Sequence, residues 1–264
     1  TGIANGTSGG ILGFTGSTTI ASSGLLAAND TRNDSLQHGI AYLLKTFHKE
    51  KLYLVGQSFG SALGIHLAAT HPELFCAYVG MGQVIHYDRS VEITYAWLHG
   101  VLEKAGDAES LKKIEKDHFP SIDLVTRYGG HHRLSLDLGA VMRASPYYYD
   151  GYAEVLQKGK TFSQECVARN PSAFTAPWTI TELKVPVYFF EGVYDHVIAC
   201  APELVAEFAD KVRAPAKELI WFRDSAHLVN LEEPGKFQDE LIRIREKTYY
   251  SSSRTVSRRP AGEG

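Results

Sequence analysis

The sequence predicts an α/β protein with a mostly parallel sheet and helices on both faces. Short apolar runs alternate with helical segments along most of its 264 residues, a pattern typical of strands that are buried on both sides. At Gly56–Gly60 an apolar run passes abruptly into a helical pattern through a turn of small residues. From residue 86 to about residue 183 the pattern is helical and aromatic throughout, which indicates a set of helices inserted between two strands.

The chain opens on a segment that offers little regular structure. Residues 1–33 are rich in Gly, Ser, Thr and Asn, and only 11–14 and 18–20 have weak strand character. We expect this segment to be poorly ordered. Apolar residues then recur at helical spacing from Leu36 to Phe47, which predicts a helix that leads into the first well-defined strand.

That first strand is predicted over Lys51–Val55 and is followed directly by Gly56-Gln57-Ser58-Phe59-Gly60. The five residues match Gly-x-Ser-x-Gly, in which a sharp strand-to-helix turn lifts a serine hydroxyl out of a sheet. A small-residue helix follows over Ser61–Ala69. Ser58 is therefore the candidate nucleophile, and the alternative interpretation of the same residues is a plain surface turn.

The later elements complete one core that is interrupted by the insertion. Strands are predicted over Phe75–Met81, Val185–Phe190 and Glu218–Phe222, with a helix over Pro234–Ile244. We assign residues 34–85 and 184–247 to the core and residues 86–183 to the insertion. Residues 248–264 lack apolar periodicity and are predicted to form a disordered tail.

Serine is a poor nucleophile at neutral pH, so an activating base and an orienting acid are needed. Asp195 follows one predicted strand and His227 follows the next, and the carboxyl ends of parallel strands meet at one edge of a sheet. Each has an ordinary alternative. Asp195 could be a turn residue, Glu191 lies four residues earlier as another acid, and His227 is one of 11 histidines.

Taken together, these residues resemble the α/β-hydrolase superfamily from about Asp34 to Arg245, and they are most similar to its prolyl-iminopeptidase-like branch. Four segments carry the resemblance: 51–61, 80–84, 185–195 and 218–227. It implies Ser58 as nucleophile, Asp195 as acid, His227 as base, and the backbone amide of Phe59 as one oxyanion donor. It also implies that the insertion is a lid and that the reaction passes through an acyl-enzyme.

The resemblance implies release of an N-terminal residue from short peptides, with small-ester hydrolysis as the alternative. The lid acids Glu92, Glu154 and Glu165 are candidates to hold a substrate amine, or are solvated helix residues.

The chain departs from this family upstream of Ser58. Only 57 residues precede it, and Gly9–Phe14 is glycine-rich but lacks the histidine and proline of the loop that supplies a second oxyanion donor. We therefore expect N-terminal strands to be missing, the strand at 51–55 to have an unpaired edge, and the chain to self-associate through it. Weak turnover, or a binding module without turnover, is the alternative function.

Composition excludes several other classes. A net charge of −3 leaves no basic excess for nucleic acid, and no apolar run is long enough to span a membrane. Three scattered cysteines give no disulfide framework, so a reducing, cytoplasmic compartment is expected. His131 and His132 are adjacent and point in different directions, so neither a metal site nor any cofactor is predicted.

Overall fold

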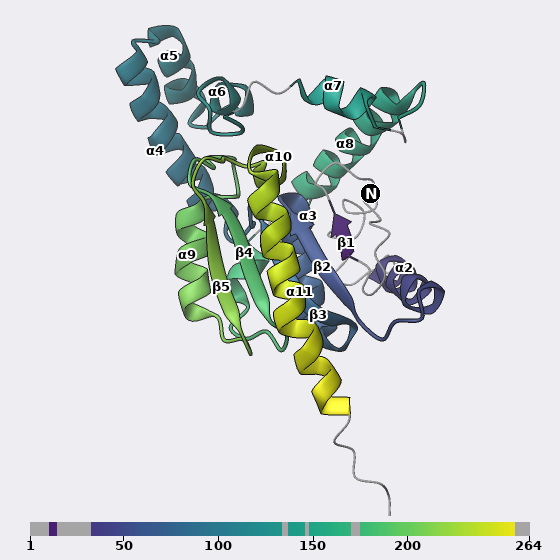
Figure 1. The fold of residues 1–264 in the computed structure, drawn as a ribbon. Coiled ribbons are helices and arrows are strands. Elements are labelled where there is room, and N and C mark those ends of the chain that lie inside the picture. The colour runs from purple at the N-terminus through teal and green to yellow at the C-terminus, as the bar shows by residue number, and fades with distance from the viewer. Residues whose placement is uncertain (1–10, 15–32, 134–136, 146–147, 170–174, 257–264) are drawn as a thin grey trace, which may run out of the picture.

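The fold is a five-stranded parallel sheet with strands in the order β1-β2-β3-β4-β5 (Figure 1). The computed structural model describes residues 11–14, 33–133, 137–145, 148–169 and 175–256. The strands are β1 (Ile11–Phe14), β2 (Leu52–Gln57), β3 (Phe75–Met81), β4 (Val187–Gly192) and β5 (Lys217–Phe222). The predicted α/β class, with helices on both faces, is confirmed.

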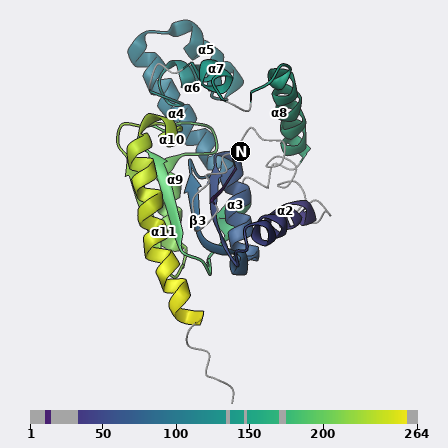
Figure 2. The same cartoon turned by 45° about the vertical axis from the view of Figure 1, so that its right-hand side comes forward.

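Helices connect each strand to the next. The elements outside the insertion are α2 (Asn33–Thr46), α3 (Phe59–Thr70), the 3₁₀ turn η1 (Pro72–Leu74), α9 (Pro202–Lys211), α10 (Val229–Glu232) and α11 (Pro234–Val256). Helices α2, α3 and α9 share one hydrophobic core on one face of the sheet, and α10 and α11 cover the other face (Figures 1 and 2). Because connections between parallel strands are right-handed, a sheet built in chain order places its crossover helices on a single face.

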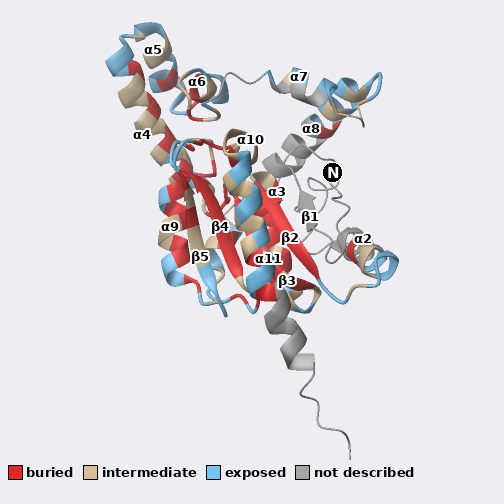
Figure 3. Ribbon diagram, in the orientation of Figure 1, coloured by how far each residue is buried: buried red, intermediate tan, exposed pale blue. Residues whose placement is uncertain are grey.

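Alternate side chains of the strands supply the two cores. Along β4, Val187 and Phe189 face α3 and α9, whereas Tyr188 and Phe190 face α11. All four side chains are buried, which explains why the strand is apolar without interruption instead of alternating (Figure 3).

The insertion consists of helices that stand over one end of the sheet. They are α4 (Tyr87–Ala105), α5 (Ala108–Asp117), α6 (Ile122–Arg127), α7 (Leu138–Arg143), α8 (Tyr152–Arg169) and the 3₁₀ turn η3 (Ala176–Thr179). In Figure 1, α4 to α6 form one group and α7 and α8 lie apart from it. The first group has its own small core, formed by Leu98, Leu102, Ile114, Leu124 and Val125.

Two sequence-based expectations about the ends of the chain are wrong. β2 is not an edge strand, because β1 pairs with it in parallel from Ile11↔Tyr53 to Phe14↔Gly56. Of the other residues in the segment predicted to be poorly ordered, Asn33 begins α2, and residues 1–10 and 15–32 lie outside the described residues. The predicted tail is helical as far as Val256, because the buried Thr248 hydrogen-bonds to Tyr53 and anchors α11 beyond residue 247. Residues 257–264 lie outside the described residues.

Candidate active site

Ser58 stands in a strained turn between β2 and α3. Its backbone has φ 52° and ψ −125°, values that a residue other than glycine rarely adopts. The turn is tight enough that a Cβ at Gly56 would lie 2.6 Å from the Gly60 carbonyl oxygen. The Ser58 amide donates to the carbonyl of Met81 on β3, at 2.9 Å. The Gly-x-Ser-x-Gly segment thus forms the predicted elbow, with Ser58 partly exposed.

Asp195 and His227 form a buried, hydrogen-bonded pair. His227 Nδ1 and Asp195 Oδ2 are 2.7 Å apart, and the two residues are 4% and 0% exposed. The second oxygen of Asp195 accepts the backbone amide of Val197 at 2.9 Å. The loops that carry the pair follow β4 and β5 and pass so close that a Cβ at Gly192 would lie 1.9 Å from the Ala226 carbonyl oxygen. The structure therefore pairs Asp195, and not Glu191, with the imidazole.

The backbone of Gly82 lies directly against the side chains of His227 and Asp195. It has φ +49°, and a Cβ there would lie 2.6 Å from both Cε1 and Nδ1 of His227 and 3.2 Å from Asp195 Oδ2. Its amide donates to the carbonyl of Phe190 on β4, at 3.2 Å. The turn after β3 thus limits the space in which the imidazole can lie.

The Ser58 hydroxyl and the His227 imidazole are both described by the structure, and they are not hydrogen-bonded to each other. Ser58 Oγ lies 4.0 Å from Sγ of Cys200, a weak contact at the limit for sulfur. Burial raises the pKa of the Cys200 thiol well above its usual range, and the nearby carboxyl group of Asp195 adds to the effect. In ligand-free structures the bond between nucleophile and base is often long and tightens with substrate.

Ser61 and Phe59 complete the elbow. The Ser61 hydroxyl donates to the Ser58 carbonyl and accepts the amide of Val84 at 2.9 Å, so it ties the elbow to the turn after β3. Phe59, the predicted oxyanion donor, is the first residue of α3, where helix amides point out of the helix. The loop expected to supply a second donor would follow β1, and residues 15–32 lie outside the described residues.

Gly130 and His131 in the insertion hydrogen-bond to the two loops that carry Asp195 and His227. These contacts were not predicted from the sequence. The carbonyl of Gly130 accepts the amide of His196 at 2.9 Å, and the carbonyl of His131 accepts the amide of His227 at 3.1 Å. Trp97 on α4 stacks on His196 with the rings 4.0 Å apart. The paired glycines at 129 and 130, which let the chain turn after α6, were the available signal.

His131 lies beside the catalytic candidate His227, with their ring centroids 5.7 Å apart. Burial lowers the pKa of His131 to about 4, and the nearby His227 and His132 act in the same direction. The side chain is therefore neutral at physiological pH. It contributes no positive charge to the site.

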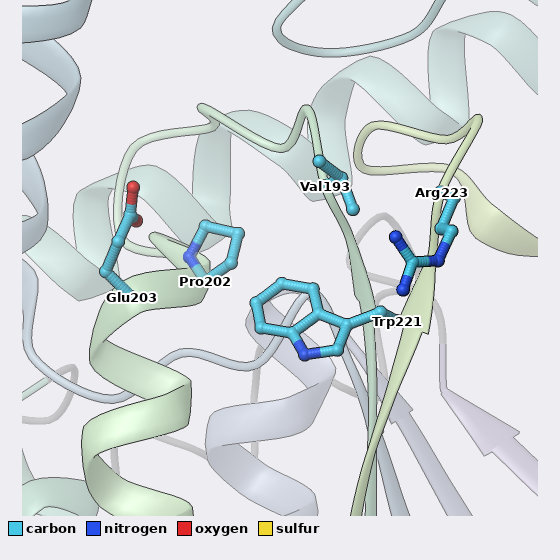
Figure 4. Close-up of a pocket in the computed structure, with 5 residues that line it drawn as sticks. All are labelled: Val193, Pro202, Glu203, Trp221 and Arg223. Atoms are coloured by element: carbon cyan, nitrogen blue, oxygen red, sulfur yellow. The ribbon is translucent and has the colours of Figure 1, made fainter.

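Other binding features are limited in the described part of the chain. No group of three His, Cys, Asp or Glu side chains there could hold a metal ion, and no helix there could cross a membrane. A cavity of about 370 Å³ lies beside the Asp195 loop and is lined by Val193, Pro202, Glu203, Trp221 and Arg223 (Figure 4). Of these, Val193, Glu203 and Arg223 are exposed, so it is a surface depression outside the acid–base pair.

Two of the three lid acids, Glu92 and Glu154, have side chains that the structure describes. Glu92 is exposed, and Glu154 is exposed and paired with Lys158 at 2.7 Å. The side chain of Glu165 lies outside what the structure describes.

A serine elbow at one strand end, with a buried Asp–His pair after two later strands, defines the α/β-hydrolase class. The model of the alpha/beta hydrolase fold family matches residues 11–234, and the chain belongs to this family.

Among curated proteins, the chain is 28% identical over 216 residues to a "Probable aminopeptidase YbaC" of Bacillus subtilis, covering 76% of this chain and 67% of that protein. It is 22% identical over 241 residues to a "Proline iminopeptidase" of Saccharolobus solfataricus, covering 83% of this chain and 71% of that protein. A proline iminopeptidase structure from Mycobacterium smegmatis shares 13% identity with a TM-score of 0.49, over 81% of this chain and 71% of that one.

Proposed function

We propose that the chain is a serine hydrolase that releases the N-terminal residue from short peptides through an acyl-enzyme. The observation that carries the proposal is the 2.7 Å bond between buried Asp195 and His227, at the same sheet edge as the strained Ser58 turn. The peptide substrate is supported by the names of the two curated relatives, an aminopeptidase and a proline iminopeptidase.

The chemistry follows from the roles of these groups. Ser58 Oγ bonds to the substrate carbonyl carbon while its proton passes to His227 Nε2. Asp195 accepts the hydrogen bond from Nδ1–H without taking the proton, which fixes the tautomer and stabilises the imidazolium. The imidazolium then gives its proton to the leaving amine as the C–N bond breaks, and water hydrolyses the acyl-enzyme by the same route.

The Phe59 amide is the proposed donor to the oxyanion. It begins α3, and the partial positive charge of a helix N-terminus also favours negative charge there. One oxyanion donor contributes about 100- to 1000-fold to turnover. A chain that relies on Phe59 alone should therefore turn over substrate more slowly than one with two donors.

Labelling and hydrolysis together test the proposal. A fluorophosphonate probe should label the intact chain and fail to label Ser58→Ala. Ser61→Ala should still be labelled although it loses the two hydrogen bonds described above. The intact chain that has not been treated with the probe should release free proline or alanine from the corresponding p-nitroanilides, and treatment with the probe should abolish this activity. Labelling that survives Ser58→Ala would overturn the assignment, and cleavage of p-nitrophenyl acetate alone would make the chain an esterase.

A binding module without turnover is the second candidate, because the Ser58 hydroxyl contacts Cys200 and not His227. This alternative predicts no labelling and no hydrolysis of either substrate class. Binding of a peptide would then persist unchanged in Ser58→Ala.

A further inference from the structure

Glu191 is a buried acid that the proposed chemistry does not use. It is the penultimate residue of β4 and is 0% exposed. Its Oε1 accepts the backbone amide of Gln83 at 3.0 Å, while Oε2 has no hydrogen-bond partner within the described part of the chain. Buried polar atoms are nearly always hydrogen-bonded, so a carboxyl oxygen without a partner beside a reactive centre requires an explanation.

No positive charge faces Glu191 in the described residues. The titratable groups around it are Asp195 on the following loop, Tyr78 from β3 and Cys200 before α9. Burial raises the pKa of Glu191 well above its usual range and Asp195 raises it further, whereas the hydrogen bond from the Gln83 amide acts in the opposite direction and is outweighed. Burial also raises the pKa values of Tyr78 and Cys200.

The hydrogen bond from Gln83 links Glu191 to the imidazole of His227. Gln83 directly follows Gly82, whose backbone lies against the His227 ring. The Gln83 side chain is itself held, since its Oε1 accepts the Tyr78 hydroxyl at 2.6 Å and its Nε2 donates to the Val84 carbonyl at 2.8 Å. Glu191 is therefore one of the groups that fix the position of the Gly82–Gln83 turn.

We propose that Glu191 is a positioning residue, which as a neutral acid holds the Gly82–Gln83 turn against His227 and on losing its proton releases that turn. A buried carboxylate without a cation, next to Asp195, is costly, so the ionised side chain would move toward water and carry the turn with it. The role rests on the proposed function, because it concerns the base of that reaction. Ionisation of Glu191 then sets the alkaline limit of turnover.

The test compares pH profiles of kcat/KM between pH 5 and 10 for the intact chain, Glu191→Gln and the control Glu246→Gln. Glu246 lies exposed on α11, so the control makes the same chemical change far from the site. For the intact chain and the control, kcat/KM should fall at least tenfold at alkaline pH. For Glu191→Gln, kcat/KM should not show this fall. Tyr78 and Cys200 are present in all three proteins, so the missing decline would belong to Glu191. An alkaline decline that persists in Glu191→Gln would overturn the proposal.

A second measurement does not depend on turnover. The proton NMR signal of His227 Nδ1–H, in its bond to Asp195, should disappear at alkaline pH in the intact chain and persist to higher pH in Glu191→Gln. The same signal behaviour in both proteins would refute the positioning role. If no substrate is hydrolysed but the signals differ as expected, the proposed function fails while the positioning of the imidazole by Glu191 stands.

Discussion

The substitution Gly82→Ala tests whether the Asp195–His227 geometry depends on the turn after β3. The new methyl group would lie 2.6 Å from two atoms of the His227 ring, where ordinary contact begins near 3.4 Å. The ring must therefore retreat by about 0.8 Å, and misplacement of a catalytic group by about 1 Å can cost roughly 100-fold in rate. The retreat also stretches the 2.7 Å bond to Asp195.

The same substitution should also lower the free energy of unfolding. This loss can be measured separately from the loss of turnover. Alanine at a positive φ costs about 1–2 kcal/mol, and overpacking adds about 1–3 kcal/mol. A typical domain has about 5–15 kcal/mol of stability, so the variant should remain folded. Gly100→Ala on α4 is the matched control, because a Cβ there meets nothing within 4 Å.

We expect kcat/KM on a prolyl or alanyl anilide to fall at least 100-fold in Gly82→Ala and to stay unchanged in Gly100→Ala. Urea unfolding at 25 °C confirms that each variant is folded under the assay conditions. Turnover of folded Gly82→Ala within about threefold of the unsubstituted chain would refute the reasoning. It would mean that the imidazole works from a position other than the one described.

Three further predictions follow from single contacts. Asp195→Asn should lower kcat by about 10⁴-fold through the wrong imidazole tautomer, whereas Glu191→Gln should lower kcat only slightly at neutral pH. The reverse order in steady-state kinetics would make Glu191 the acid. Thr248→Val removes the hydrogen bond to Tyr53 and should cost about 1–2 kcal/mol in urea unfolding, and no loss would show that α11 is not anchored there. His131 has a pKa of about 4 in the fold, below its unfolded value, so its share of stability is present above about pH 6.5 and lost as pH falls toward 4. Unfolding midpoints of His131→Gln should therefore fall less steeply with acid, and an unchanged slope would contradict the lowered pKa.

The sequence predicted β2, β3 and β4 because their residues are almost all buried on both faces of the sheet. β3 was predicted with its observed bounds, and β2 and β4 to within two residues. Pairing of β1 was not predicted, because a run of only four residues in a polar segment carries no signal of its partner strand. The continuation of α11 was missed for a related reason, since it is anchored by a contact between Thr248 and Tyr53, which are 195 residues apart.

The candidate site residues could be named because strand ends converge in a parallel sheet. That rule placed Ser58, Asp195 and His227 at one edge. It left Glu191 open as an acid, since both acids follow the same predicted strand, Val185–Phe190. The structure separates the two by orientation, because Asp195 contacts the imidazole and Glu191 contacts the Gln83 amide. Gly130 and His131 hydrogen-bond to the loops that carry Asp195 and His227. These bonds depend on where the insertion lies, which local sequence does not encode.

The acid–base pair lies between one neutral base and one neutral acid. Protonation of His131 would place a positive charge 5.7 Å from the His227 ring and oppose the imidazolium that forms during proton transfer. Ionisation of Glu191 would add a second carboxylate beside Asp195 and release the turn that confines the ring. Burial lowers the pKa of His131 and raises that of Glu191, so the same physical cause keeps both side chains uncharged between these two limits. The His227 imidazole is the group in direct contact with Asp195. Protonation of His131 at acid pH should therefore disturb proton transfer. Ionisation of Glu191 at alkaline pH should do the same.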